Sequence, residues 1–289
     1  MTDMKIAHAT DSELQLVFSD IRRRHTAYFG LLYIGALVVV AVVAPFISPF
    51  DPLVQNLEHR LLPPTYPHLL GLDEFGRDVL SRLIHGATIS IQIGLEVVSL
   101  SLFIGVVVGT ISGYYGGWID MLLMRIADIF LAFPSLVLAI GIMAALGPGI
   151  FKVVLALVVV AWPRYARVIR SQTLSLRNLD FIMAAKAMGA NTRRIILSHI
   201  IPNALPPVII LATLGMGEAV LAEAGLSFLG LGVSPPTPSW GVMISSARDY
   251  ILQAPHIVGA AGIAISLTVL AFNLLGDGIR DALDPKLRI

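Results

Sequence analysis

The chain has 289 residues, of which 56% are hydrophobic and 13% charged, and its mean hydropathy is +0.82. Soluble domains carry roughly a quarter of their residues as charged side chains, so this composition excludes an ordinary soluble domain and indicates an integral membrane protein. The 20 Lys and Arg nearly balance the 19 Asp and Glu, and the net charge of +1 gives no indication of a nucleic-acid partner. The absence of cysteine excludes disulfides, thiolate metal sites and cysteine nucleophiles.

The first segment of the chain has an amphipathic pattern beside three adjacent arginines. Leu14, Val17, Phe18 and Ile21 fall at positions i, i+3, i+4 and i+7, which predicts a helix on the inner membrane surface. A solvated basic anchor is the alternative interpretation. A secretory signal is disfavoured, because the apolar run that follows is longer than the roughly 7 to 15 residues of a signal core.

Six apolar runs are long enough for membrane-spanning helices, since a bilayer core of about 30 Å needs about 20 apolar residues. A closed β-barrel would show alternating segments of about ten residues instead. The expected fold is therefore all-α and polytopic. Its six transmembrane helices are predicted at residues 28–47, 88–112, 122–146, 151–166, 204–224 and 257–275.

The connection between the first two runs changes character halfway. Its first half is rich in proline, which predicts an extended, turn-rich path. Its second half predicts an interfacial helix that leads into the second span, with an i, i+4 pair of Asp78 and Arg82 on the polar face. The apolar face comprises Phe75, Val79, Leu80, Leu83 and Ile84.

The orientation follows from Lys and Arg in the connections. With the N-terminus inside, fifteen of them fall on the inner side, Arg164, Arg167 and Arg170 among them, and five on the outer side. Both termini are therefore expected to face the cytoplasm. The five outer residues are Arg60, Arg77, Arg82, Lys152 and Arg248.

Small and acidic residues within the runs suggest packing and polar contacts. Gly105 and Gly109, with Gly113 after them, have the four-residue spacing that lets helix backbones approach closely. The carboxylates expected within spans, Glu96, Glu218 and Glu223, either pair with polar groups on neighbouring helices or line a watery passage. Alternatively, they could relay protons in a proton-coupled carrier.

Signatures of covalent chemistry are missing from the sequence. It contains no GxxxxGK[ST] phosphate-binding loop and no HExxH zinc motif, and its histidines are scattered over separate connections. We therefore expect no catalytic residue, no cofactor and no metal ion in this chain.

The stretch MAAKAMGANTRRIILSHIIPN, residues 183–203, is a long polar interruption between apolar runs. Strong helix formers precede Gly189, which supplies a C-terminal stop, and Asn191 or Thr192 can cap a second helix. The pattern predicts a helix, a glycine corner and a second helix on the cytoplasmic side, with small side chains suited to a partner's groove. The expected docking residues are Met183, Ala184, Ala185, Lys186, Ala187, Met188, Gly189, Ala190, Arg193 and Pro202.

This stretch resembles the EAA loop of ABC importer permeases. The family pattern is E-A-A, three residues, G, nine residues, then I-x-L-P, and the matching positions are Ala184, Ala185, Gly189, Ile201 and Pro202. Met183 replaces the usual Glu and His199 the usual Ile. The helix and the glycine corner do not depend on either departure.

Three further stretches are similar to the C-type subunit of the dipeptide, oligopeptide and nickel permease family. They are GLDEFGRDVLSRLIHGA, GLSFLGLGVSPPTPSWG and LAFNLLGDGIRDALDPKLR, and with the loop they cover the chain from Gly71 to Arg288. The segment SPPTPSW also predicts a proline-stiffened outer loop that ends in an interfacial Trp240.

The resemblance implies a type I ABC importer permease in a bacterial or archaeal inner membrane. This chain would line half of a passage for peptides and contact membrane lipid. Its partners would be a second, B-type permease, two cytoplasmic ATPases that bind ATP, and an extracytoplasmic solute-binding protein. Members of the family carry dipeptides, longer peptides, nickel chelates or glutathione, so the exact solute stays open.

The same resemblance divides the chain into three parts. Residues 1–87 hold the cytoplasmic start, the first span and the outer loop; residues 88–277 hold a five-helix permease core with the coupling loop at about 177–203; residues 278–289 form a cytoplasmic tail. A self-sufficient secondary transporter using Glu96, Glu218 or Glu223 is the alternative. A membrane enzyme would need a clustered reactive site, and none can be assembled from adjacent motifs.

Overall fold

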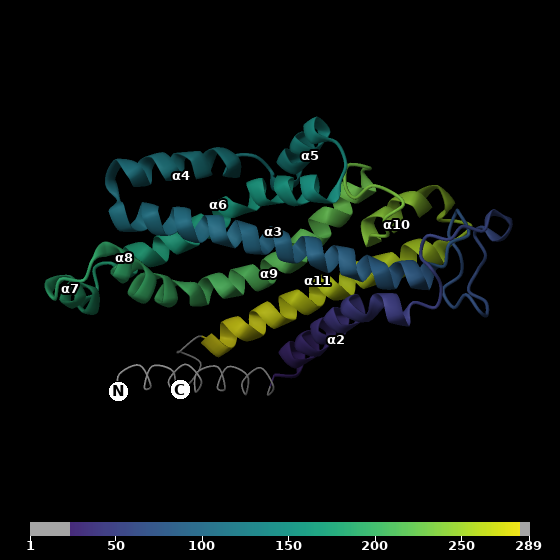
Figure 1. The fold of residues 1–289 in the computed structure, drawn as a ribbon, viewed down its shortest axis with the longest axis horizontal. Helices are drawn as coiled ribbons and strands as arrows, with labels where there is room; N and C mark the ends of the chain where they lie inside the picture. Colours follow the sequence, from purple (N-terminus) through teal and green to yellow (C-terminus); the bar gives the residue numbers. More distant parts are fainter. Residues whose placement is uncertain (1–23, 284–289) are drawn as a thin grey trace.

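The structure, a computed structural model, describes residues 24–283. The predicted amphipathic segment 14–21 and most of the basic start lie outside these residues, as does the end of the tail. Long helices run side by side along the long axis of the molecule (Figure 1). The helices of the described residues, long and short, are α2 (His25–Ile47), α3 (Val79–Tyr115), α4 (Gly117–Leu131), α5 (Ser135–Leu146), α6 (Ile150–Leu176), α7 (Asp180–Ala187), α8 (Thr192–Ile195), α9 (Ile201–Phe228), α10 (Trp240–Ala247) and α11 (Pro255–Leu283).

Four continuous helices are long and apolar enough to cross a membrane. They are α2, α3, α11 and the helix Thr192–Phe228, which joins α8 to α9 through one π-helical segment, Ile196–Ile200. Pro202 has no N–H to donate to the carbonyl four residues earlier, so the ladder cannot continue regularly there. The all-α membrane architecture is therefore confirmed, with four such helices among the described residues.

The third predicted run is not one straight helix. It divides into α4 and α5, which meet at a break of three residues with an angle of 86° and would together make a fifth span. The break ends at Pro134, which disfavours helical geometry at Phe133 and cannot donate a backbone hydrogen bond. The prediction of a single helix over 122–146 is wrong for this reason.

The fourth predicted run ends too early. The helix α6 continues to Leu176, so Arg164, Arg167 and Arg170 lie within it and not in a connection. Its charges keep α6 outside the group of helices that are apolar enough to cross a membrane by composition alone. Counting these three arginines among the charges of an inner connection was therefore wrong, although the predicted span 151–166 already contained Arg164.

The helices α3 and α6 pack closely at the glycines whose spacing predicted a close approach of helix backbones. A Cβ atom added at Gly109 would lie 2.9 Å from Ile169 Cβ, and one at Gly113 would lie 2.7 Å from Thr173 Cβ. Gly105 faces Tyr165 and Ala166 in the same way. The predicted close approach of helix backbones is confirmed.

We expect Gly109→Val to destabilise the protein, because its side chain would collide with the α6 backbone at Ala166. Overpacking of this kind costs about 1–3 kcal/mol. Thermal unfolding of the detergent-purified protein measures the loss. Gly141→Val in α5 is the matched control, since a Cβ there meets nothing within 4 Å. Equal stability of the two variants would contradict the packing argument.

The helix predicted at the start of the second span does form, but not as a separate element. It begins at Val79 and continues without a break to Tyr115, and Asp78 caps it by accepting a hydrogen bond from Ser81 N. The predicted pair of Asp78 with Arg82 is wrong. Asp78 instead accepts from Ser81 and contacts His68, while Arg82 pairs with Asp73.

Trp240 is a core residue and not an interfacial one. Only 1% of its surface is exposed, and its indole N–H donates to the Leu83 carbonyl at 3.0 Å. A Cβ at Gly86 would lie 2.7 Å from its ring, so α3 makes room for the indole there. The interaction ties the start of α10 to α3, and the predicted interfacial location of Trp240 is wrong.

Candidate functional site

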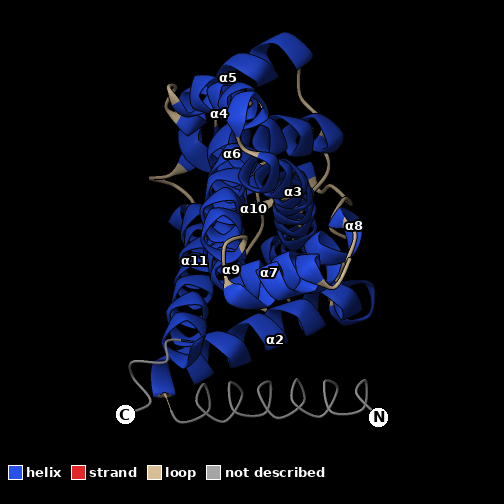
Figure 2. Cartoon of the chain, turned by 90° about the vertical axis from the view of Figure 1, so that its left-hand side faces the viewer, coloured by secondary structure: helices blue, strands red, loops and turns tan. Residues whose placement is uncertain are grey.

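The stretch singled out in the sequence forms a helical corner at one end of the molecule. Viewed from that end, α7 lies across the bundle, whereas α3 is seen nearly end-on (Figure 2). Gly189 has φ of +83°, a left-handed conformation that favours glycine, and Asn191 caps α8 by accepting from Arg194 N at 2.8 Å. The predicted local structure of helix, glycine corner and second helix is confirmed, with α7 starting at Asp180.

The inner face of α7 is anchored to this chain. Ile182 is fully buried and packs in a cluster with Ile195 and Ile200, and Tyr114 at the end of α3 packs against that cluster. Lys186 Nζ lies 5.5 Å from the centre of the Tyr114 ring. These contacts hold the corner against the end of α3.

Ala185 belongs to this inner face, because it is only 6% exposed. It is therefore unavailable to a partner's groove, and its inclusion among the docking residues is inconsistent with the observed burial. The outward side chains of α7 and its C-cap form what we name the α7 outer face: Met183, Ala184, Ala187 and Met188. Met188 is 83% exposed, the most among the large hydrophobic residues of this corner.

A second feature is a cavity of about 250 Å³ between α3, α5, α6 and α9. Its walls are mostly apolar, and the break between α4 and α5 brings Leu131, Ser135 and Leu136 to its rim. Arg164 and Glu218 also line it, with Arg164 Nη1 at 2.7 Å from Glu218 Oε1. The cavity thus carries one positive and one negative group near the middle of α6 and α9.

The three acidic residues singled out in the sequence have different surroundings. Glu218 pairs with Arg164, a partner that the sequence prediction missed because it counted Arg164 among the charges on the inner side. Glu96 accepts from Gln92 on its own helix at 2.9 Å. Glu223 is fully buried and accepts from Ser227 at 2.7 Å. The three carboxylates therefore have separate partners and do not form a common site.

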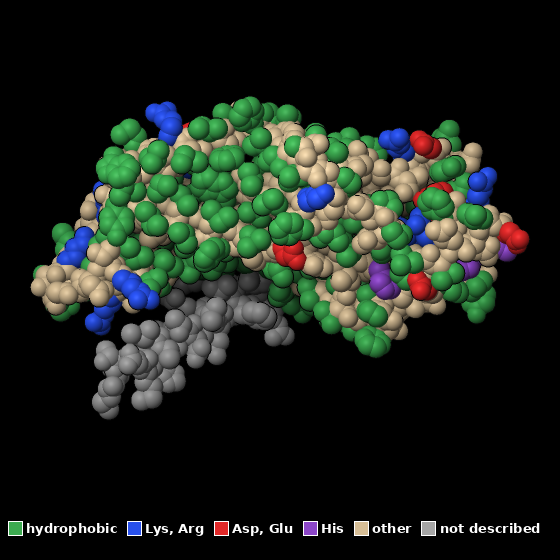
Figure 3. Space-filling model, turned by 45° about the horizontal axis from the view of Figure 1, so that its top comes forward, with side chains coloured by type: hydrophobic (Ala, Val, Ile, Leu, Met, Phe, Trp, Pro, Cys, Tyr) green, Lys and Arg blue, Asp and Glu red, His purple; other side chains and the backbone are tan. Residues whose placement is uncertain are grey.

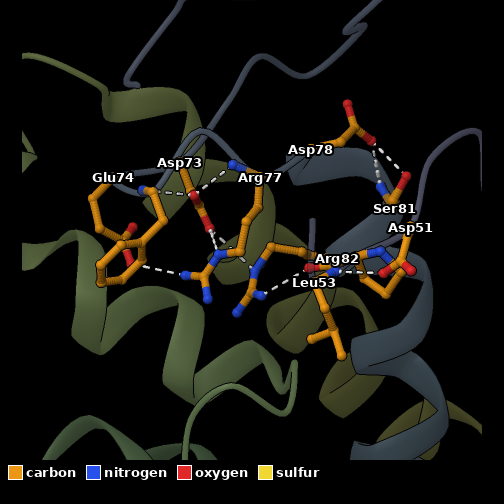
Figure 4. A network of polar contacts seen from close by, with 10 residues as sticks. Asp51, Leu53, Asp73, Glu74, Arg77, Asp78, Ser81 and Arg82 are labelled. Carbon is orange, nitrogen blue, oxygen red and sulfur yellow. Dashed lines mark hydrogen bonds and ion pairs between the residues drawn. The ribbon is translucent and has the colours of Figure 1, made fainter. Parts of the chain in front are cut away.

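A third feature is a charged network beside the start of α3 (Figure 4), at the end of the molecule opposite α7 (Figure 1). Asp73 accepts from Arg77 Nε at 2.7 Å and lies 3.3 Å from Arg82 Nε, and all three side chains are buried. Glu74 accepts a further bond from Arg77 at 3.0 Å. Burial raises the pKa of the Glu74 carboxyl, as does the Asp73 charge, while Arg77 lowers it.

This network fixes the outer connection to the start of α3. Arg82 donates to the Pro52 carbonyl at 3.1 Å, and Phe50 N donates to Ser81 Oγ at 3.1 Å. The turn around Asp73 and the proline-rich half are thereby joined to one helix end. The role of the charged network is structural, because its acidic and basic side chains pair with one another.

The lateral surface beside α4 is strongly apolar. Hydrophobic side chains gather over this face, with few charges between them (Figure 3). A surface of this kind suits lipid or another apolar membrane surface. Its exposed members include Trp118, Met121, Leu122, Ile129, Phe133 and Val137.

Two family models match the chain. Residues 105–289 match the family described as binding-protein-dependent transport system inner membrane component. Residues 12–64 match the N-terminal TM domain of oligopeptide transport permease C. Together they include the first span and most of the helices that surround the cavity.

Known proteins with similar sequences align over nearly the whole chain. The dipeptide transport system permease protein DppC of Alkalihalophilus pseudofirmus is 46% identical over 271 residues, 94% of this chain and 89% of that protein. The di/tripeptide transport system permease protein DppC of Pseudomonas aeruginosa is 44% identical over 96% of this chain and 93% of its own length. The glutathione transport system permease protein GsiD of Escherichia coli is 43% identical, over 92% and 88%.

The fold is also similar to a solved structure. A chain of the inward facing MetNI methionine ABC transporter aligns with a TM-score of 0.56 over 70% of this chain and 97% of its own length. The sequence identity is 20%, so this similarity concerns the fold alone.

Proposed function

This chain belongs to the binding-protein-dependent transport system inner membrane components, and from that premise we propose how its parts divide the work of a peptide importer. It is a permease subunit of an ABC transporter and not an enzyme. The resemblance to the dipeptide and oligopeptide permeases inferred from the sequence is confirmed by relatives 41–46% identical over nearly the full chain. One observation supports this division of roles: the α7 outer face is exposed at one end of the bundle, and a cavity lined by Arg164 and Glu218 lies in its middle.

The α7 outer face contacts a cytoplasmic ATPase and transmits the ATP-driven closure of the ATPases to the helices. Support comes from its shape, since the inner side is fixed by Ile182 while the outer side exposes small and flexible apolar side chains. Two ATPases bind the ATP, a second permease completes the passage, and an extracytoplasmic protein delivers the solute. The apolar surface beside α4 meets lipid or the second permease.

The chain crosses the bacterial inner membrane six times in this proposal. The crossings are α2, α3, the bent pair α4 and α5, α6, α9 and α11, with both chain ends and α7 in the cytoplasm. The type I permease unit of this proposal begins with α3 at Val79 and not at 88, and it includes α11 up to Leu283, beyond the expected boundary at 277. Helix lengths support five of these crossings, because each of the continuous helices α2, α3, α6, α9 and α11 has at least 23 residues, whereas α4 and α5 have 15 and 12 residues on either side of their bend.

Single cysteines test this orientation, because the native chain has none. Asp78 is unsuitable as a reporter, since it is buried. We expect a membrane-impermeant thiol reagent applied to intact cells to label Tyr66→Cys and Leu252→Cys, whose native side chains are 93% and 96% exposed, and to spare Met188→Cys. The opposite labelling pattern would reverse the topology.

Transport by reconstituted vesicles tests the function itself. We expect peptide uptake that needs ATP, the partner ATPases and the binding protein, and that continues when a protonophore collapses the proton gradient. The physical reason is that Glu218 is paired with Arg164 and Glu96 with Gln92, so neither resembles a free proton relay. Uptake that stops on adding the protonophore while ATP stays high would favour the proton-coupled carrier instead.

A further inference from the structure

The cavity between α3, α5, α6 and α9 holds a charge pair that the packing of the helices does not require. Arg164 and Glu218 expose 46% and 60% of their side chains, so their ion pair opens to the cavity and is not enclosed. Exposed pairs contribute little to stability. Charges in the middle of spanning helices are costly and mark the pathways of polar solutes. This pair therefore suits a ligand better than it suits a structural bridge.

The chemistry of the cavity selects one class of ligand. A zwitterion inserted between the two groups would replace one ion pair by two and leave the net charge at zero. The guanidinium can hold a carboxylate through two parallel hydrogen bonds, and the Glu218 carboxylate can accept from an ammonium. The apolar walls, for example Leu136, Leu157 and Val160, suit uncharged side chains. A short peptide with free termini combines all these features.

We propose that Arg164 and Glu218 bind the two charged termini of a peptide as it passes through the membrane. Arg164 holds the α-carboxylate and Glu218 holds the α-ammonium. The volume of about 250 Å³ lies below the roughly 300–1,000 Å³ of pockets that enclose drug-sized ligands. This chain therefore encloses only part of a short peptide, and the second permease forms the opposite wall of the site. This inference rests on the proposed function.

A neighbouring ion pair provides the matched control. Arg167 lies three residues after Arg164 on α6 and pairs with Asp128 of α4, with side-chain exposures of 53% and 44%. Neither residue lines the cavity. Neutralising Arg167 thus removes an equally exposed arginine from the same helix without touching the proposed site.

The test compares peptides with free and blocked termini in vesicles that contain the whole transporter. Free, C-amidated and N-acetylated forms of one dipeptide are supplied at concentrations that saturate the binding protein, whose own preference is then common to all variants. We expect Arg164→Gln to lower uptake of the free peptide about tenfold relative to the C-amidated one, a difference of about 1.4 kcal/mol. Glu218→Gln should lower uptake of the free peptide about tenfold relative to the N-acetylated one. Arg164→Lys should keep most of the wild-type ratio of free to C-amidated peptide uptake, because it retains the positive charge. Arg167→Gln should leave this ratio unchanged.

A purely structural role would give a different pattern. If Arg164→Gln and Glu218→Gln lowered uptake of all three peptides by the same factor, or changed none of them, the proposed site would be overturned. Co-purification of the ATPases should stay unchanged in both variants, because neither residue lies on the α7 outer face. A wild-type transporter without ATP-dependent uptake of any peptide would overturn the proposed function itself.

Discussion

Ala184→Asp is expected to release the ATPases from the purified complex and to reduce peptide uptake by at least tenfold. Ala184 lies on the α7 outer face, where a new carboxylate would lose its water in the partner's groove without a counter-charge. The fold of this chain should persist, since the side chain points away from Ile182 and its cluster. Co-purification of the ATPases and uptake by vesicles measure the two effects.

Ala185→Asp is the informative neighbour, because Ala185 faces the chain itself. This variant should lower the thermal stability of the corner, and it should thereby uncouple ATP hydrolysis from peptide uptake without changing the α7 outer face. Gly189→Val has open space around its Cβ but must adopt a left-handed backbone, at a cost of about 1–2 kcal/mol. If Ala184→Asp and Gly189→Val both retained full ATPase binding and full uptake, the corner would be only a connector.

Asp73→Ala is expected to cost the protein about 3–5 kcal/mol of stability, because it leaves the buried guanidinium groups of Arg77 and Arg82 without their shared carboxylate. It also removes the acceptor for the backbone N–H groups of Phe75 and Arg77. The outer connection should then detach from α3. Thermal unfolding and protease sensitivity of the purified complex measure the loss.

Glu74→Gln is the matched control for this network. Its amide oxygen can still accept from Arg77, and the Asp73 carboxylate stays in place. We therefore expect a much smaller loss. The double variant Asp73→Ala with Arg82→Met should recover part of the stability, since it removes one of the stranded charges. An Asp73→Ala protein as stable as the wild type would show that water reaches these arginines freely.

Sequence patterns within a few residues of one another correctly predicted the structures that are determined by neighbouring residues in the chain. The glycine corner at Gly189 follows from a run of helix formers, a residue tolerant of positive φ and a capping Asn191, all within a few positions. The close packing of α3 on α6 follows in the same way from glycines four residues apart. Apolar run length located α2, α3, α9 and α11 within a few residues or turns.

Features that depend on tertiary contacts could not be predicted in this way. Hydropathy treats a proline in an apolar run as neutral, so the break at Pro134 was missed, although the proline itself was a signal. The charge count also assigned Arg164 to the inner side, which hid its pairing with Glu218 across two helices. Likewise, an aromatic residue beside a loop looks interfacial until a groove such as the one at Gly86 is known to receive it.

The length of α3 has a mechanical consequence. Its 37 residues span about 55 Å, far more than a bilayer core of about 30 Å, so both ends protrude as one rigid rod. One end carries Arg82 of the charged network, and the other places Tyr114 against the α7 corner. If the rod pivots at its close contact with α6 around Gly109, a tilt of about ten degrees displaces the Tyr115 end by about 2 Å and the Val79 end by about 8 Å, in opposite directions. A displacement of the α7 corner would therefore move the opposite end of α3, without any helix having to bend.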